Sequence, residues 1–362
     1  MSLQDGRERE TEGAQERGPA HVERVKTERL RAAGIGGAAR VARAAALLRE
    51  GGTVAFPTET VYGLGANAFD AAAVAKIFAA KQRPQWDPLI VHVEGPEMLE
   101  RVAVVPAELR REVDALMAAF WPGPLTLLLP RSAAVPDAVT AGRPLVGVRM
   151  PAHGLARELI RQAEVPLAAP SANRFGSLSP TTAAHVLADL DGRIDAVLDG
   201  GATHVGVEST VLDVGAMAIY RPGAVTAAMI ARVIGGEVRV LDKAAAAEGG
   251  PEGLASPGMG MRHYAPRARL VLVASQSELL EEIEKYPASE VGVMLPDGWD
   301  AGAAKAVFRW GPWGDAEVLA RLLFAGLRML DERGVAAIVC PVPEMDGLGA
   351  ALRDRLQKAA RE

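Results

Sequence analysis

The sequence contains a single cysteine, Cys340, among 362 residues. No disulfide can therefore form within the chain, and no Cys/His spacing matches a zinc site. No apolar run reaches the roughly 18 residues that a membrane-spanning helix needs. Lysine and arginine (40) do not outnumber aspartate and glutamate (45), so the chain lacks the basic excess of nucleic-acid binders. These absences favour a cytoplasmic protein that meets any polyanion through a local cluster of cations.

The composition, with 49% hydrophobic and 23% charged residues, is that of a globular protein. Its length suggests about two domains of roughly 150 residues each. Residues 1–25 offer few apolar side chains and are predicted to form a disordered tail. We expect an α/β domain over 26–240, a Gly- and Pro-rich linker over 241–268, and a C-terminal α/β domain over 269–362.

Apolar periodicity predicts a mixed α/β domain and then a small parallel sheet covered by helices. The strands expected in the first domain are 53–56, 89–93, 125–129, 146–150, 167–169, 196–198, 210–214 and 217–220, and the helices are 38–50, 71–80, 107–120, 154–163, 181–190 and 226–234. In the second domain we expect strands 270–274, 291–295, 306–310 and 336–339 and helices 278–286, 316–332 and 348–360. Asp70, Ser179 and Thr226 stand where helix N-caps belong.

The sequence lacks the Gly-x-x-x-x-Gly-Lys-Ser/Thr pattern of a P-loop. The stretch GIGGAARVARAAALL from Gly34 has the glycine spacing of a dinucleotide-binding turn, but the residues before it form a poor strand pattern. A glycine-punctuated helix start is the favoured interpretation. A bound nucleotide would therefore be held in some other way.

Cationic and hydroxyl residues recur where predicted strands and helices end. Lys81 and Arg83 follow the helix 71–80, where a cation also simply favours the negative end of the helix dipole. Ser171 and Asn173 follow the strand 167–169, and turn formation alone would explain them. Because α/β sheets place ligands at strand ends, these residues are candidates for an anion site.

Two polar residues lie inside predicted strands. Arg149 interrupts an apolar run and either faces water at a sheet edge or needs an anionic partner. His92 is either a satisfied core histidine or a ligand-binding group. His263 and Tyr264 lie in the predicted linker, which has no core of its own, so we expect the linker to close over a ligand as a lid.

A series of motifs in a fixed order resembles the threonylcarbamoyl-AMP synthase family with its YrdC-like fold, in the long form that carries an additional C-terminal domain. The motifs are FPTETVYGLGANAFD, KQRP, PLIVHV, WPGPLT, VTAG, VRMPAH, APSAN, SPT, GVEST, YRPGAV and SPGMGMRHYAP, followed more loosely by GLGAALRDRLQKAA. The dense part of the resemblance covers about residues 36–267.

The resemblance implies a nucleotidyltransferase that makes threonylcarbamoyl-AMP and pyrophosphate from L-threonine, bicarbonate or CO2, and ATP, with Mg2+ expected. It implies that the product supplies tRNA modification through partner proteins, with no membrane and no direct tRNA binding required. It assigns catalysis and phosphate contacts to Lys81 and Arg83. The implied ATP-binding residues are Lys81, Arg83, Thr140, Ser171, Asn173, Ser179, Arg221 and Tyr264, and the implied threonine-binding residues are Thr58, His92, Arg149 and Ser209.

Two departures from the family pattern stand out. Gly260 and Met261 occupy linker positions where the family commonly has lysine and an aromatic residue, and Asp354 stands where asparagine is usual. Two alternative functions stay open at this point: an RNA-binding YrdC-like module without catalysis, and a transferase that uses carbamoyl phosphate. The acidic net charge of −5 counts against the first. Carbamoyl-phosphate cleavage without any need for threonine would indicate the second.

Overall fold

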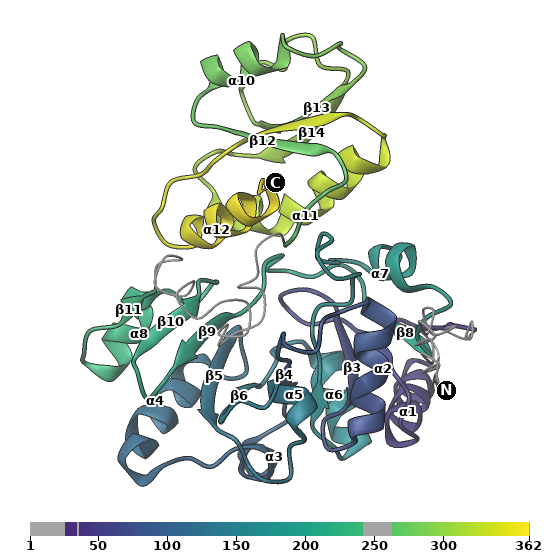
Figure 1. Cartoon of the computed structure of the whole chain (residues 1–362), viewed down its shortest axis with the longest axis vertical. Coiled ribbons are helices and arrows are strands. Elements are labelled where there is room, and N and C mark those ends of the chain that lie inside the picture. The colour runs from purple at the N-terminus through teal and green to yellow at the C-terminus, as the bar shows by residue number, and fades with distance from the viewer. Residues whose placement is uncertain (1–25, 35, 242–262, 362) are drawn as a thin grey trace, which may run out of the picture.

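The computed structural model describes residues 26–34, 36–241 and 263–361. Figure 1 shows a larger part that contains most of the chain and a smaller C-terminal part stacked on it. The predicted tail (1–25) and most of the predicted linker (242–262) lie outside the described residues. Within the described ranges, no helix has both the length and the apolar character needed to cross a membrane.

The larger part is built on a mixed sheet of 11 strands in the order β1-β8-β2-β3-β7-β4-β6-β5-β9-β10-β11. Its strands are β1 (Glu28–Arg31), β2 (Val54–Phe56), β3 (Gly63–Asn67), β4 (Ile90–His92), β5 (Leu125–Pro130), β6 (Leu145–Arg149), β7 (Leu167–Ala168), β8 (Ala196–Asp199), β9 (Thr210–Asp213), β10 (Ala218–Arg221) and β11 (Arg239–Val240). The helices are α1 (Gly37–Arg49), α2 (Ala71–Lys81), α3 (Pro96–Val102), α4 (Arg110–Phe120), α5 (Asp137–Thr140), α6 (Gly154–Ala163), α7 (Ala183–Leu190) and α8 (Ala227–Ile234).

The smaller part contains a four-stranded sheet in the order β12-β15-β13-β14, and all of its neighbouring strands run parallel. Its elements are β12 (Arg269–Val273), α10 (Gln276–Ile283), β13 (Val291–Pro296), β14 (Ala306–Gly311), α11 (Ala316–Glu332), β15 (Ala337–Pro341) and α12 (Gly349–Ala359). Figure 1 shows α11 and α12 on the side of this sheet that faces the larger part. The predicted small parallel sheet is confirmed.

The two parts share one hydrophobic cluster. Val61 and Val207 of the larger part pack in the same buried cluster as Leu323, Phe324 and Leu352 of α11 and α12. Burial of apolar side chains on both sides of the junction stabilises it at roughly 25 cal/mol per Å² removed from water. The C-terminal part is therefore packed directly against the segments that carry the candidate site.

The structure corrects several sequence predictions. Ser179 is not a helix N-cap: α7 begins later, and Thr182 accepts the capping hydrogen bond from the amide of His185. The N-caps Asp70 and Thr226 are confirmed. The strand β1 was missed because its sequence, ERLR, is mostly charged, and the parallel pairing with β8 supplies the order that its composition does not predict.

The strand β3 was also missed, because its sequence GLGAN is rich in glycine. Gly65 explains that composition: a Cβ atom there would come within 2.7 Å of the ring of Phe56. Arg149, by contrast, does not face water at a sheet edge, because β6 lies between β4 and β5 and the residue is 4% exposed.

Candidate active site

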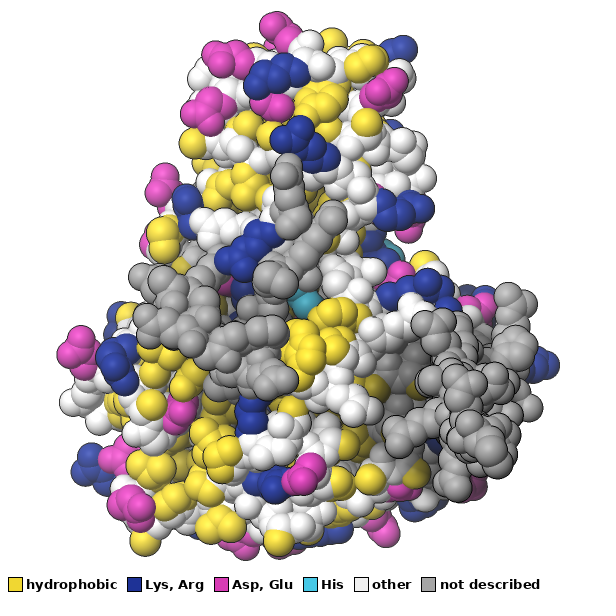
Figure 2. All heavy atoms as spheres, in the orientation of Figure 1, with side chains coloured by type: hydrophobic (Ala, Val, Ile, Leu, Met, Phe, Trp, Pro, Cys, Tyr) yellow, Lys and Arg dark blue, Asp and Glu magenta, His cyan; other side chains and the backbone are white. Residues whose placement is uncertain are grey.

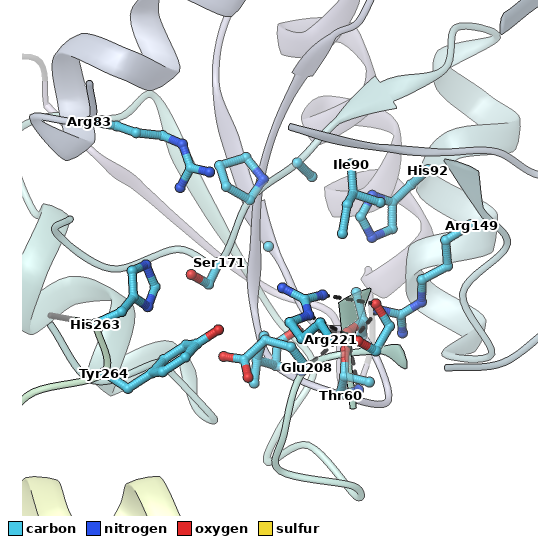
Figure 3. A pocket seen from close by; sticks show the side chains of 16 residues that line it. Thr60, Arg83, Ile90, His92, Arg149, Ser171, Glu208, Arg221, His263 and Tyr264 are labelled. Atoms are coloured by element: carbon cyan, nitrogen blue, oxygen red, sulfur yellow. Dashed lines mark hydrogen bonds between the residues drawn. The ribbon is translucent and has the colours of Figure 1, made fainter. Parts of the chain in front are cut away.

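A cavity that is partly open to solvent lies among the ends of several strands of the large sheet, and its empty space, open solvent included, is about 530 Å³. Figure 3 shows its labelled residues converging from separate segments. Eight of the twelve predicted site residues line it: Thr58, Arg83, His92, Arg149, Ser171, Ser209, Arg221 and Tyr264. In the space-filling view, Lys/Arg side chains and a histidine lie along the junction between the two parts (Figure 2).

Three arginines on this cavity make it strongly electropositive. Arg83, Arg149 and Arg221 are 4–7% exposed. Among the described residues of the lining, Glu208 is the only carboxylate. Arg83 and Arg149 are paired with Asp87 and Glu59, but both of these carboxylates lie outside the cavity lining. The lining itself thus presents mainly positive charge, which suits an anionic ligand.

Arg83 is held in a fixed orientation by the loop that follows it. Its guanidinium donates to the carbonyl oxygens of Asp87 and Pro88, and forms a 2.8 Å ion pair with the Asp87 carboxylate. Burial raises the pKa of Asp87, and the charge of Arg83 counteracts that rise. Because Arg83 needs no rearrangement to present its charge, it is preorganised for an anion. Asp87 was not recognised as a site residue from the sequence.

Lys81 does not line the cavity but lies behind it. It is the last residue of α2, is 1% exposed, and its Nζ donates to the carbonyl oxygens of Ser171 and Asn173. Burial, followed by the charge of Arg83, lowers its pKa well below the ordinary value. Lys81 therefore braces the Ser171–Asn173 loop against α2, which is a role beyond that of a helix-end cation.

The hydroxyls that follow β2 form a compact network. Thr58 Oγ1 donates to the carbonyl of Val61 and lies 2.8 Å from Thr60 Oγ1. Arg149 NH1 donates to Thr60 Oγ1 at 3.0 Å. Because the one proton of the Thr58 hydroxyl goes to Val61, Thr60 is the donor in the pair of hydroxyls. Thr60 was not predicted as a site residue, although it lies two residues from Thr58, which was.

His92 faces the cavity as a neutral imidazole. Burial, followed by the charge of Arg149, lowers its pKa to about 3. Its ring makes an edge contact with Phe56, with centroids 6.0 Å apart, and its Nδ1 atom has no hydrogen-bond partner in the structure. A buried polar atom without a partner is costly. Its place in the cavity lining keeps His92 a candidate for threonine binding.

Glu208 connects the cavity to the C-terminal part. Its carboxylate accepts from Ser179 Oγ and from Arg355 of α12, and the Arg355 contact is 2.7 Å with both side chains buried. Burial opposes ionisation of Glu208, but the charges of Arg355 and Arg221 outweigh it and lower its pKa below the ordinary value. Arg355 also lies 5.4 Å from the ring centroid of Tyr264. Sequence reasoning missed Arg355, because the pattern Leu-Arg-Asp-Arg-Leu in a helix is typical of a solvated surface.

The remaining predicted residues are placed as follows. Arg221 donates to the carbonyl and hydroxyl oxygens of Ser209. Thr140, Asn173 and Ser179 are 0–1% exposed and are not part of the cavity lining. Asn173 instead anchors its own loop by donating to the carbonyl of Ser177, whereas the hydroxyl of Thr140 has no hydrogen-bond partner.

His263 and Tyr264, the described end of the predicted linker, are buried and line the cavity. His263 lies between Phe175 and Tyr264, with ring centroids 5.7 Å and 4.2 Å away. Burial, followed by the nearby cations Arg83 and Lys81, lowers its pKa well below the ordinary value. Tyr264 belongs to the cluster shared by both parts and contacts Phe324 of α11.

The fold and cavity define a two-part α/β protein whose arginine-lined cavity is connected to the C-terminal part through Glu208 and Tyr264. A family model described as telomere recombination matches residues 46–223, and one described as threonylcarbamoyl-AMP synthase, C-terminal domain, matches residues 225–361. The threonylcarbamoyl-AMP synthase of Pyrococcus abyssi is 44% identical over 326 residues, which cover 88% of this chain and 93% of that protein. The chain belongs to the threonylcarbamoyl-AMP synthase family.

Further relatives agree with this placement. The threonylcarbamoyl-AMP synthase of Bacillus subtilis is 44% identical over 329 residues, covering 89% of this chain and 93% of that protein. The crystal structure of P. abyssi Sua5 complexed with L-threonine superposes with a TM-score of 0.82 at 43% identity, covering 92% of this chain and 97% of the other. The resemblance inferred from the motifs and the two-part α/β fold are both confirmed.

Proposed function

We propose that this protein is an L-threonylcarbamoyladenylate synthase, a nucleotidyltransferase that converts L-threonine, bicarbonate or CO2, and ATP into threonylcarbamoyl-AMP and pyrophosphate. The observation that carries the proposal is the cavity with three buried arginines and one carboxylate, in a chain that matches an L-threonine complex over 92% of its length. The product would serve the threonylcarbamoyladenosine modification of tRNA through partner proteins. We place the protein in the cytoplasm.

The charge pattern of the cavity supports a division into two subsites. Figure 3 shows Arg83 and Arg149 on opposite sides, with Ser171 and Tyr264 nearer Arg83 and with His92 nearer Arg149. We assign ATP to the side of Arg83, and Lys81 supports that side from behind through the Ser171–Asn173 loop. Threonine is assigned to the side of Arg149 and His92. Arg221 lies between the two in Figure 3 and donates to Ser209, and we assign the meeting point of the substrates to this pair.

The chemistry needs no nucleophile from the protein. The threonine amine takes up CO2 to give a carbamate, whose oxygen attacks the α-phosphorus of ATP while the bond to pyrophosphate breaks. Negative charge then accumulates on phosphoryl oxygens, and fixed guanidinium groups stabilise it. Aligning three substrates in one cavity could remove roughly 7–11 kcal/mol of the barrier in the best case.

Magnesium fits this site as a companion of ATP. Among the described residues, no cluster of three or more His, Cys, Asp or Glu side chains could hold a metal ion by itself. Both oxygens of Glu208, the cavity carboxylate, already have protein partners. This pattern suits Mg2+, which commonly keeps its waters and binds through substrate phosphates. When bound it would neutralise charge on the pyrophosphate leaving group.

Omission of single substrates tests the proposal. Purified protein with ATP, L-threonine and bicarbonate is expected to release pyrophosphate, and leaving out either threonine or bicarbonate should abolish the release. Carbamoyl phosphate with ATP but without threonine is the control for the alternative transferase. Pyrophosphate release that ignores threonine would refute the proposal.

A further inference from the structure

We infer that Glu59 is a positioning residue for threonine: it holds the guanidinium of Arg149 in the orientation in which Arg149 meets the substrate carboxylate. This inference rests on the proposed function, because it takes threonine as the ligand of Arg149. Glu59 is not part of the cavity lining, so it would act through Arg149 and not on the substrate.

Glu59 and Arg149 form a buried ion pair. Glu59 Oε1 lies 2.5 Å from Arg149 NH2, and the two side chains are 9% and 4% exposed. The other carboxylate oxygen, Oε2, accepts from the backbone amide of Ala152 at 3.1 Å. Ala152 lies just beyond the end of β6, so Glu59 links the guanidinium of Arg149 to the backbone of the loop that follows it.

The guanidinium is restrained from three sides. Its NH1 donates to Thr60 Oγ1 at 3.0 Å, its Nε donates to the carbonyl of Gly123 at 3.3 Å, and its NH2 faces Glu59. Thr60 and Glu59 are consecutive residues, so one turn supplies two of these three restraints. Any change that moves this turn would move the arginine.

The NH2 group retains hydrogen-bonding capacity. Although it lies close to Glu59 Oε1, the angles do not make an aligned hydrogen bond, and both buried atoms are without a hydrogen-bond partner in the structure. The contact is therefore mainly electrostatic. Because Arg149 lines the cavity, its guanidinium charge acts on an anionic ligand there while Glu59 holds that charge in place.

The turn that carries Glu59 is itself anchored. The carbonyl of Glu59 accepts from the amides of His204 and Val205 at 3.2 and 2.8 Å, and the carbonyl of Thr60 accepts from the amide of Gly206 at 3.1 Å. Gly206 opens the GVEST segment, which also contributes Glu208 and Ser209 to the cavity. The Glu59 carboxylate thus projects from a rigid backbone, as a positioning residue requires.

Glu59→Gln tests the inference, because glutamine keeps the size of the side chain and an acceptor for the Ala152 amide but loses the charge. We expect the KM for threonine to rise about tenfold or more, while the KM for ATP changes less than about twofold, since Arg83 lies across the cavity. Glu94→Gln is the matched control. Glu94 pairs with Arg157 at 3.6 Å, but those side chains are 36% and 39% exposed, so this change should leave both KM values unaltered.

A double-mutant cycle separates positioning from a direct role. In an Arg149→Met background, Glu59→Gln should raise the KM for threonine by less than about twofold, because the group through which it acts is gone. The inference would be overturned if the effects of Glu59→Gln and Arg149→Met on the KM for threonine simply multiplied. It would also be overturned if Glu59→Gln raised the KM values for threonine and ATP equally, or left the KM for threonine unchanged. If Glu59→Gln fails to fold, Thr60→Val removes the neighbouring restraint on NH1 and must produce the same selective rise. The wild-type requirement for threonine and bicarbonate tests the function separately.

Discussion

The buried ion pair between Glu208 and Arg355 provides the sharpest test of how the two parts of the molecule cooperate. Arg355 is fully buried and contacts Glu208 and Asp354, both at 2.7 Å. Arg355→Met would leave Glu208 buried, with Ser179 as its remaining side-chain hydrogen bond. Stranding a buried charge in this way costs about 3–5 kcal/mol in the free energy of unfolding.

The reverse change should be milder. Glu208→Gln leaves Arg355 paired with Asp354, so we expect a loss of about 1–3 kcal/mol, the cost of a hydrogen bond to a charged group. The double variant should lose less than the sum of the two, with a coupling energy of up to about 3 kcal/mol. Urea unfolding followed by far-ultraviolet circular dichroism at pH 7.5 measures all three variants.

Arg161→Met is the matched control. Arg161 pairs with Glu158 at 2.6 Å, nearly the same distance, but those side chains are 61% and 38% exposed. Its loss should cost at most about 1 kcal/mol. Additive effects of the Glu208 and Arg355 changes, or a cost for Arg355→Met no larger than that of the control, would show that the pair does not couple the two parts.

The pH dependence provides a further check on the same pair. The pKa of Glu208 lies below its ordinary value of 4.5, because the charges of Arg355 and Arg221 outweigh the effect of burial. The folded state thus binds the Glu208 proton more weakly than the unfolded state does. The contribution of ionised Glu208 to the free energy of unfolding is therefore complete above about pH 4.5, and it is lost as the pH falls through the lower pKa of Glu208 in the folded state. The stability difference between wild type and Arg355→Met should therefore shrink below pH 4.5.

Three further predictions follow from the site. Lys81→Ala and Arg83→Ala should each lower turnover at least about tenfold. Both should also lower the urea midpoint, because Lys81 braces the Ser171–Asn173 loop from within the core and Arg83 is the buried partner of the Asp87 carboxylate. Normal turnover in both variants would remove them from the site. His92 should stay neutral from pH 5 to 8, since its pKa is about 3. The unfolded state binds this proton more readily, so the stability of the wild type should fall as the pH drops below about 6.5, and it should fall less steeply in His92→Gln. Titration of the His92 ring signals near pH 6.5 by NMR would contradict this. Serine should replace threonine as a substrate better than valine does. Serine loses only a methyl contact of roughly 1–3 kcal/mol, whereas valine leaves a buried polar group of the protein unpaired. Equal turnover of serine and valine in the pyrophosphate assay would exclude a contact to the threonine hydroxyl.

Tyr264 shows where the interpretation of the linker depended on the structure. Its position in a Gly- and Pro-rich segment predicted a lid residue whose loss would weaken nucleotide binding more than stability. In the structure it is 1% exposed and packs with Phe324 and Arg355 of the C-terminal part. Truncation to alanine would therefore also open the shared core, at about 3–5 kcal/mol. Tyr264→Phe, which keeps the ring, is the better probe of a nucleotide contact. Closure of the linker itself stays a prediction, because residues 242–262 lie outside the described structure.

The sequence alone determined the elements with strong local signals. Periodic apolar runs placed most helices and strands within a few residues, and α11 (Ala316–Glu332) agrees at both ends. Side chains that act within a few residues of their own position, such as the N-caps Asp70 and Thr226, were also predictable because capping is local. The cationic and hydroxyl residues at the ends of these elements identified most of the cavity lining, because each stands out against an apolar background.

Only the tertiary structure decided which of these groups have partners. Glu59 meets Arg149 from 90 positions away, counted from the two residue numbers, and Glu208 meets Arg355 across 147. No local pattern encodes such pairs, since an acidic residue in a turn and an arginine on a helix are usually solvated. Burial converts them into strong interactions, because a charge removed from water must find its counterion inside the fold. The charges were thus visible in the sequence, but their pairing, and with it the orientation of the arginines in the cavity, depends on how the sheet and the C-terminal helices bring distant segments together.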